Sequence, residues 1–170
     1  SDEGVPVAQR VYGEGSYLRP NFVQPYRSKN ILIAGVTIIN APMWEVNPVL
    51  CTNVTVRGVK VNSHGPNNDG YAPEACTDVL IEDCIFDTGD DCIAIKSGRD
   101  NDGRRVGVAS ENIIVRNSEA ILTVDFQYEG GANGPHKPVV RNVTMENVRG
   151  ASSPRVMWIA GFAGATIDNI

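Results

Sequence analysis

Long apolar runs are missing from this chain of 170 residues, and none reaches the ~18 residues that a membrane-spanning helix needs. The start, Ser1 to Gly4, has no basic-then-apolar pattern, so no targeting signal is expected there. Positive charge is also scarce, because the net charge is -5 and the pI is about 5.0. This balance argues against binding to nucleic acid or to an anionic membrane. It does not exclude an acidic substrate, since a few local Lys and Arg side chains can outweigh it.

Metal-binding cysteine patterns are missing as well. The four cysteines form no CxxC pair and do not combine with the two histidines at zinc spacing. Each cysteine lies beside apolar, strand-like residues, which favours buried free thiols over a disulfide or a metal role. The residues are Cys51, Cys76, Cys84 and Cys92.

A repeat is present in place of helical periodicity. Each copy starts with a polar Asn or Asp, continues with alternating β-branched residues, breaks briefly and enters a second apolar run. Such alternation predicts short strands, and the Gly and Asn punctuation predicts turns. The copies lie at residues 28–40, 51–63, 76–88, 110–117 and 140–150.

The spacing of the repeat indicates a solenoid. Asn30, Asn53 and Asp78 are 23 and 25 residues apart, and polar loops at residues 99–106 and 129–138 widen the later gaps. A period in the twenties built from short strands predicts an all-β parallel β-helix. An antiparallel sandwich also contains many short strands, but it does not explain why whole segments resemble one another.

The repeat also predicts one domain over residues 1–170, with residues 1–25 as an incomplete first coil. Equivalent positions of successive coils should stack in a β-helix. Cys51 and Cys76 are therefore expected to be neighbours in the interior.

Three aspartates fall one period apart. Asp90 and Asp91 follow the Thr88-Gly89 turn, and Asp69 stands 22 residues before Asp91 in Asn67-Asn68-Asp69-Gly70. A β-helix would stack them in one patch, where repulsion raises at least one carboxyl pKa. A protonated carboxyl beside an ionised one suits glycoside hydrolysis. A calcium site and solvated turn-forming aspartates remain alternatives at this point.

The motifs HGPNNDG (residues 64–70) and TGDDCIAIKSG (residues 88–98), with the asparagine-led repeat, resemble the polygalacturonases, glycoside hydrolase family 28. The likeness runs from about residue 25 to residue 170 and is closest to bacterial members. It implies a right-handed parallel β-helix and inverting hydrolysis of α-linked galacturonide bonds in pectin-type polysaccharide, with no metal or cofactor. It also implies a secreted or periplasmic protein. By this resemblance Asp90 is the general acid, while Asp69 and Asp91 hold and activate the attacking water.

Three basic residues are candidates for binding the substrate. Lys96 follows Asp91 by five residues and could meet a uronate carboxylate, or it could pair with a local aspartate. His64 precedes the Asp69 turn and either orients the substrate or packs in the turn. Arg99 lies on the loop after the acid strand, where it either attracts a polyanionic sugar or solubilises the loop. The neighbouring residues 100–103 lack the later Glu of a calcium loop and are expected to form a turn.

Two motifs of the family are missing. The downstream Gly-His-Gly and Arg-x-Lys runs that should orient the carboxylates and bind substrate do not occur, and losses of this kind commonly cost about 10²-fold in rate. The alternatives are therefore a catalytically impaired β-helix that binds acidic oligosaccharide, or a calcium-dependent enzyme resembling pectate lyase.

The junction at Asn117 and Ser118 accounts for both losses. Two strand-like segments meet there with no Gly, Pro or Asn-Gly turn, and the sequence after it resembles a later part of the family. We infer that two coils, about 50 residues, are absent. The favoured interpretation predicts a gap in the structure between these two residues, and a true deletion is the alternative, which solenoids tolerate.

Overall fold

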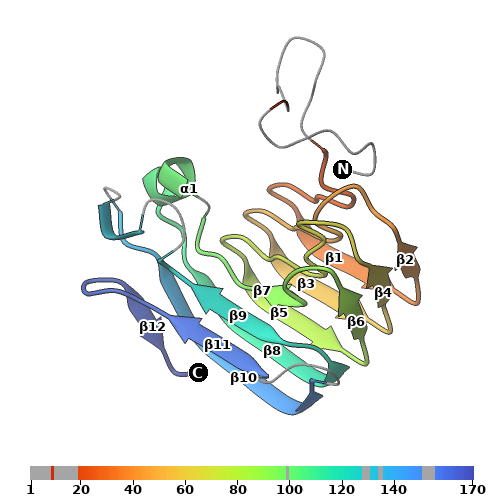
Figure 1. Ribbon diagram of the computed structural model, residues 1–170. Coiled ribbons are helices and arrows are strands. Elements are labelled where there is room, and N and C mark those ends of the chain that lie inside the picture. The colour runs from red at the N-terminus through yellow and green to blue at the C-terminus, as the bar shows by residue number, and fades with distance from the viewer. Residues whose placement is uncertain (1–8, 10–18, 99, 128–130, 134–135, 151–155) are drawn as a thin grey trace.

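The computed structural model describes residue 9 and residues 19–98, 100–127, 131–133, 136–150 and 156–170. Its strands stack coil upon coil, and every pairing between described strands is parallel (Figure 1). The predicted parallel β-helix is confirmed, and the antiparallel alternative is excluded. In the part of the chain described, no helix is long and apolar enough to cross a membrane.

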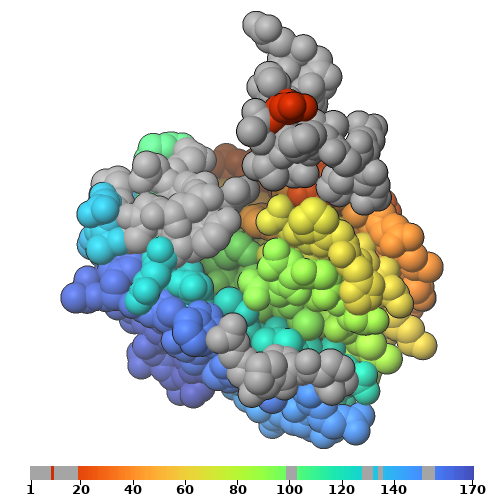
Figure 2. All heavy atoms as spheres, viewed as in Figure 1, coloured from red at the N-terminus to blue at the C-terminus, as the bar shows by residue number. Residues whose placement is uncertain are grey.

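The strands lie on three faces of the solenoid. The first face holds β1 (Lys29–Ala34), β3 (Thr52–Arg57), β5 (Thr77–Glu82), the start of β8 (Ser110–Glu119), the start of β10 (Val139–Arg149) and β12 (Thr166–Asp168). The second face holds β2 (Thr37–Ile39), β4 (Lys60–Ser63) and β6 (Ile85–Thr88), and the third holds β7 (Ile93–Ala94), β9 (Leu122–Asp125) and β11 (Met157–Ala160). Figure 2 shows the coils as neighbouring bands of colour from orange to blue.

Asn117 and Ser118, the junction where coils were inferred to be absent, lie within one strand. Both are consecutive residues inside β8, and Ser118 Oγ accepts a hydrogen bond from the Cys84 backbone N at 3.2 Å. Asn117 has a positive φ of 50°, and its counterparts on the neighbouring coils have similar values, 55° for Asp83 and 49° for Asn147. Because asparagine and aspartate tolerate this left-handed conformation, one such residue bends the strand without Gly or Pro. The absence of about two coils at this junction, under either interpretation, stays a prediction.

Asparagine side chains on the first face form a ladder that runs along the solenoid. In each pair, the Asn Nδ2 donates a hydrogen bond to the Oδ1 of the equivalent residue on the coil before it, at 2.8–3.0 Å. The pairs are Asn53 to Asn30, Asn112 to Asp78, Asn142 to Asn112 and Asn169 to Asn142. All these residues have positive φ. The repeated Asn of the sequence therefore supplies both the turn and the bond between coils.

The core fills the space between the three faces. Inward-facing residues of successive coils stack at matching registers, as in Val54 against Val79 and Val79 against Ile113, and this apolar burial is the main favourable contribution to folding. The four cysteines are buried and free, as predicted. The Thr77 backbone N donates to the Cys51 carbonyl at 3.0 Å, so Cys51 and Cys76 are neighbours on consecutive coils.

One predicted loop contains regular structure. Residues 99–106 were expected to be a polar loop with a turn at residues 100–103, but Asp100–Val106 forms the short helix α1. The backbones of Gly98 and Gly103 lie so close that a Cβ added at Gly98 would approach the Gly103 Cα to 2.5 Å. Only residues without a side chain permit this approach, so the two glycines anchor α1 beside the third face.

Candidate active site

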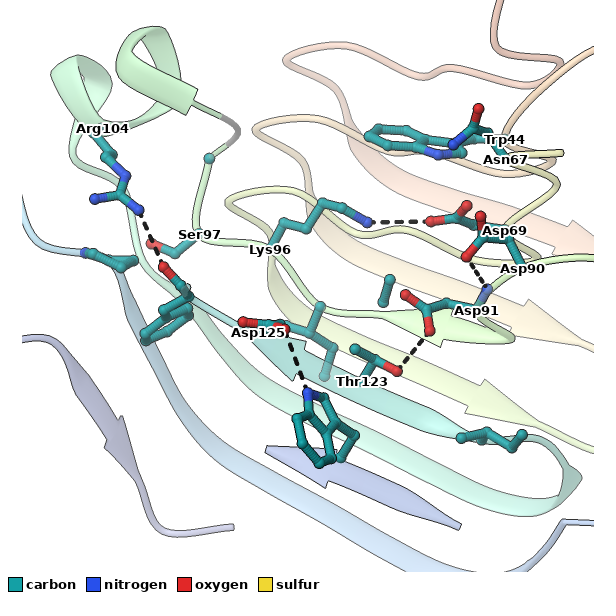
Figure 3. Close-up of a pocket in the computed structure, with 17 residues that line it drawn as sticks. Trp44, Asn67, Asp69, Asp90, Asp91, Lys96, Ser97, Arg104, Thr123 and Asp125 are labelled. Carbon is teal, nitrogen blue, oxygen red and sulfur yellow. Dashed lines mark hydrogen bonds and ion pairs between the residues drawn. The ribbon is translucent and has the colours of Figure 1, made fainter. Parts of the chain in front are cut away.

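The three aspartates of the sequence patch line one cleft on the third face. Backbone bridges pair Val46 with Tyr71 and Tyr71 with Ile93, which aligns Asp69 with Asp91 on the next coil. Asp90 lies on the adjoining turn, and all three side chains line a cleft of about 420 Å³ (Figure 3). The predicted clustering is confirmed.

The glycines of the two motifs hold these coils close together. A Cβ on Gly70 would lie 2.5 Å from Phe86 Cδ1 and 2.8 Å from the Cys92 carbonyl oxygen. A Cβ on Gly89 would lie 2.5 Å from the Gly65 carbonyl oxygen. Any side chain at either position would push the coils apart, because these distances are far below van der Waals contact. The glycines therefore set the separation between the Asp69 and Asp90 turns.

Asp69 is the most perturbed carboxyl of the cleft. Its accessibility is 5%, and its Oδ2 lies 3.4 Å from Lys96 Nζ. The pKa of Asp69 is raised to about 6, chiefly by burial; Lys96 opposes the rise, and the nearby Asp90 and Asp91 add to it. Desolvation thus outweighs the ion pair, and Asp69 exchanges its proton near neutral pH.

Asp90 and Asp91 are held by different partners. The exposed Asp90 accepts a hydrogen bond on Oδ1 from the Asp91 backbone N at 2.9 Å, and its carbonyl accepts one from Thr88 Oγ1 at 2.7 Å. The half-buried Asp91 accepts a bond on Oδ1 from Thr123 Oγ1 at 2.8 Å. The Asp90 carboxyl is therefore open to a ligand, whereas Asp91 is oriented by the next coil.

The loop that carries Asp69 is fixed from beneath by buried polar groups. Asn68 Nδ2 donates to the Ala41 carbonyl at 2.8 Å, to the Met43 carbonyl at 3.0 Å and to Glu45 Oε1 at 3.0 Å. Glu45 is completely buried, and this burial raises its pKa. These contacts keep the Asp69 turn in place, since the two hydrogens of the Asn68 amide are shared among three acceptors of the previous coil.

The three predicted binding residues have different positions. Lys96 lines the cleft, and its Nζ faces Asp69 (Figure 3) and lies 4.4 Å from the centre of the Trp44 ring. His64 is not among the cleft residues, and its Nε2 lies 3.2 Å from Asp87 Oδ1 on the neighbouring surface. Arg99 lies outside the described residues. Of the two that the structure describes, Lys96 is therefore the one placed where it can meet a ligand beside the aspartates.

Four further residues of the cleft were not found from the sequence. Trp44 lies above Lys96, while Thr123, Asp125 and Trp158 come from the coils that follow β7. Alternation in the 122–125 segment places Thr123 and Asp125 on the outer side of β9, whose burial pattern is buried, intermediate, buried, exposed. That pattern was visible in the sequence, but its position beside β7 was not, because the polar excursion of residues 99–106 hides the period.

No metal site is evident in this part of the molecule. The described residues contain no group of three or more His, Cys, Asp or Glu side chains arranged to hold a metal ion. The cleft carboxylates instead have protein partners, namely Lys96 for Asp69 and Thr123 for Asp91.

Comparison with known proteins places this cleft in a family. The profile of the glycosyl hydrolases family 28 matches residues 12–103, more than half of the chain and both aspartate motifs. The chain belongs to glycosyl hydrolases family 28. The family resemblance seen in the motifs is thus confirmed, and the Gly-His-Gly and Arg-x-Lys motifs remain departures from the family pattern.

Relatives of this family 28 chain are polygalacturonases. A probable polygalacturonase of Vitis vinifera is 36% identical over 127 residues, covering 70% of this chain and 26% of the relative. A probable polygalacturonase of Arabidopsis thaliana is 28% identical over 155 residues, covering 76% and 34%. The crystal structure of a hyperthermoactive exopolygalacturonase from Thermotoga maritima matches with 49% identity and a TM-score of 0.69, covering 86% of this chain and 34% of that one. The chain thus spans about a third of these relatives or less.

Proposed function

We propose that this chain is an inverting glycoside hydrolase that cleaves α-linked galacturonide bonds in a pectin-type polysaccharide. The observation that carries the proposal is the convergence of Asp69, Asp90 and Asp91 on one cleft, with the pKa of Asp69 raised to about 6. Membership of family 28 and the polygalacturonase names of the relatives support the substrate class. They also support a location outside the cytoplasm.

The geometry supports a division of labour among the carboxyls. Asp90 is exposed at the cleft and donates its proton to the glycosidic oxygen, so that the bond to the leaving sugar breaks with a neutral leaving group. Asp69 and Asp91 hold a water molecule whose oxygen attacks the anomeric carbon from the opposite side, and Asp69 accepts the one proton that this water gives up. The configuration at that carbon is inverted, as expected when two carboxyls act on opposite faces of the sugar.

Lys96 and Asp69 together tie the reaction to pH. A base with a pKa of about 6 is ionised at neutral pH and still holds a proton well. Below that pH Asp69 becomes protonated and no longer accepts a proton from water. The proposal therefore includes a fall of kcat/KM on the acid side of pH 6. A uronate carboxylate that binds near Lys96 competes with Asp69 for the positive charge of Lys96.

A second candidate function is binding of an acidic oligosaccharide without turnover. The observation in its favour is the direct stacking of β9 on β7, with Ile93 paired to Leu122. Because of this stacking, the group that contacts Asp91 from the next coil is the hydroxyl of Thr123 and not an imidazole. A threonine does not gain and lose a proton near neutral pH, so this side of the site contributes less to proton transfer.

A reducing-end assay on polygalacturonate separates the candidates. The hydrolase releases reducing ends with and without chelator, produces no unsaturated product absorbing in the ultraviolet, and gives the inverted anomer by NMR. The calcium-dependent, lyase-like alternative would lose its activity with chelator and produce that absorbance. Binding of oligogalacturonide with no product from the wild-type chain, under conditions where it is folded, would select the binding protein and refute the hydrolase.

A further inference from the structure

Arg19 connects the N-terminal part of the chain to two successive coils. Its Nη1 donates to the Pro42 carbonyl at 2.9 Å and to the Pro66 carbonyl at 2.6 Å, and its Nη2 donates to Asn67 Oδ1 at 3.0 Å. Pro42 follows Arg19 by 23 residues and Pro66 follows it by 47, which is close to one and two periods of the repeat. One guanidinium therefore spans the coils and ends on the turn that carries Asp69.

Asn67 is the residue of this turn that Arg19 contacts through its side chain. It stands two residues before Asp69, and it lines the cleft at the end where Trp44 lies (Figure 3). An arginine only donates hydrogen bonds, so the oxygen of the Asn67 amide must be the atom that faces Arg19. The N–H groups on Nδ2 are therefore the part of the amide that Asn67 can offer to a ligand.

Packing alone does not fix the Asn67 amide. Asn68, Asp69 and Gly70 are buried, but Asn67 is exposed, and an exposed side chain keeps rotamer freedom that binding must then remove. The bond from Arg19 removes part of this freedom before a ligand arrives. The planar guanidinium of arginine suits the task, because it directs donors to three acceptors at once, whereas a lysine ammonium is a compact point charge.

We propose that Arg19 is a positioning residue, which orients the Asn67 amide so that its Nδ2 donates a hydrogen bond to an oxygen of a bound galacturonide. The turn is then held from two sides, since buried acceptors fix Asn68 from beneath and Arg19 fixes Asn67 from outside. Arg19 is not among the residues that line the cleft, so it acts through Asn67. The inference rests on the proposed function for the identity of the ligand.

Calorimetric titration with trigalacturonate tests this role, in the Asp90→Asn background so that the ligand stays intact. Arg19→Lys keeps the positive charge but does not reproduce the three bonds, so we expect binding to be about fivefold weaker. Asn67→Gly removes the donor, tolerates the positive φ of 58° at this position, and should weaken binding by about the same factor. Adding Arg19→Lys to Asn67→Gly should cause no further loss, since the side chain through which Arg19 acts is already absent.

Arg141→Lys is the matched control. Arg141 also donates from its guanidinium to the coil before it, at Glu111 Oε2, but it lies on the first face and is not among the cleft residues. This change should leave the affinity for trigalacturonate unaltered. Asn67→Asp keeps an oxygen for Arg19 and loses the N–H donors, so it should bind no more tightly than Asn67→Gly. It provides a second test if Arg19→Lys does not fold.

The inference is overturned if Arg19→Lys or Asn67→Asp leaves the affinity for trigalacturonate unchanged, or if the Asp90→Asn chain binds no trigalacturonate. It is also overturned if Arg19→Lys weakens binding equally with and without the Asn67 side chain, as a purely structural bridge between coils would. Failure of the proposed function is distinct, because it shows as an absence of reducing ends from the wild-type chain. A chain that releases none yet shows the Asn67-dependent loss keeps the positioning role and loses the hydrolase assignment.

Discussion

The asparagine ladder and the cleft are each built from equivalent positions of successive coils, the ladder on the first face and the cleft on the third. The two stacks differ in whether the same side chain is repeated from coil to coil. Along the ladder, Asn30, Asn53, Asn112 and Asn142 repeat one side chain, so that amides bond from coil to coil. Along the cleft, equivalent positions carry Trp44, Asp69 and Asp91, three side chains of which two are like-charged. The repeated asparagines stabilise the stack of coils. The positions where the side chain changes from coil to coil form the cleft, which is the surface that can perform chemistry.

The largest effect is expected from Asp90, where the proposed chemistry is concentrated. Asp90→Asn should reduce the release of reducing ends by about 10³-fold, because an amide does not supply the proton that the leaving oxygen needs. The unfolding transition should change little, since Asp90 is exposed. Asp87→Asn, an exposed change beside His64 and outside the cleft, is the control. Turnover at the wild-type rate in Asp90→Asn would remove the acid assignment.

The next largest effect concerns the stability cost of Asp69. Its folded pKa of about 6 is above the ordinary value of 3.8, so its contribution to stability is complete below pH 3.8 and is lost as pH rises through 6. Asp69→Asn removes this dependence and should raise the free energy of unfolding by as much as about 3 kcal/mol at pH 7, relative to its effect at pH 3.5. Urea unfolding at both pH values measures the difference. An equal effect at both would show that Lys96 offsets the burial.

Thr123 tests whether the neighbouring coil orients Asp91. Thr123→Val keeps the side-chain shape and removes the hydroxyl that donates to Asp91 Oδ1, so kcat should fall about tenfold with little change in KM, as for other groups that orient a reacting residue. Thr144→Val on the exposed side of β10 is the matched control. A rise in KM alone would indicate that Thr123 contacts the substrate instead.

The smallest effect sharpens the ladder. Asp78 lacks an amide, so nothing in its side chain can donate to Asn53 as the other members donate to the coil before them. Asp78→Asn should complete the ladder and raise the free energy of unfolding by about 0.5 kcal/mol. Asp83→Asn makes the same change at a left-handed position where the previous coil carries Gly58, which has no side-chain acceptor. Equal gains in both variants would mean that the ladder contributes nothing.

The sequence predicted the parts of this molecule that repeat. The spacing of Asn30, Asn53 and Asp78 was enough to predict the coils, and the distance from Asp69 to Asp91 was enough to predict the aspartate cluster. Both succeed because equivalent positions of a parallel stack must lie one period apart. Lys96 was placed correctly by its proximity to Asp91 in the chain.

The parts that failed lie where the repeat is interrupted. Residues 99–106 form α1 in place of a loop, and Asn117 bends β8 without the expected punctuation. Once the period was lost, the coil that carries Thr123 and Asp125 could not be aligned with β7. His64 was given two interpretations, a substrate-orienting residue or a residue packed in the turn, because it precedes Asp69 in sequence; its Nε2 lies 3.2 Å from Asp87 Oδ1, and His64 is not among the described cleft residues.

The close approach at Gly89 has a consequence for recognising relatives of this chain. The glycines of the two motifs are required by the spacing between coils, whereas Asp90 is exposed and fills no space that the fold needs. Sequences that share Gly70 and Gly89 are therefore guaranteed only a common architecture. A relative with another polar residue in place of Asp90 would still be similar enough in sequence to be assigned to the family. Whether it hydrolyses a polysaccharide would have to be judged from the residue at position 90.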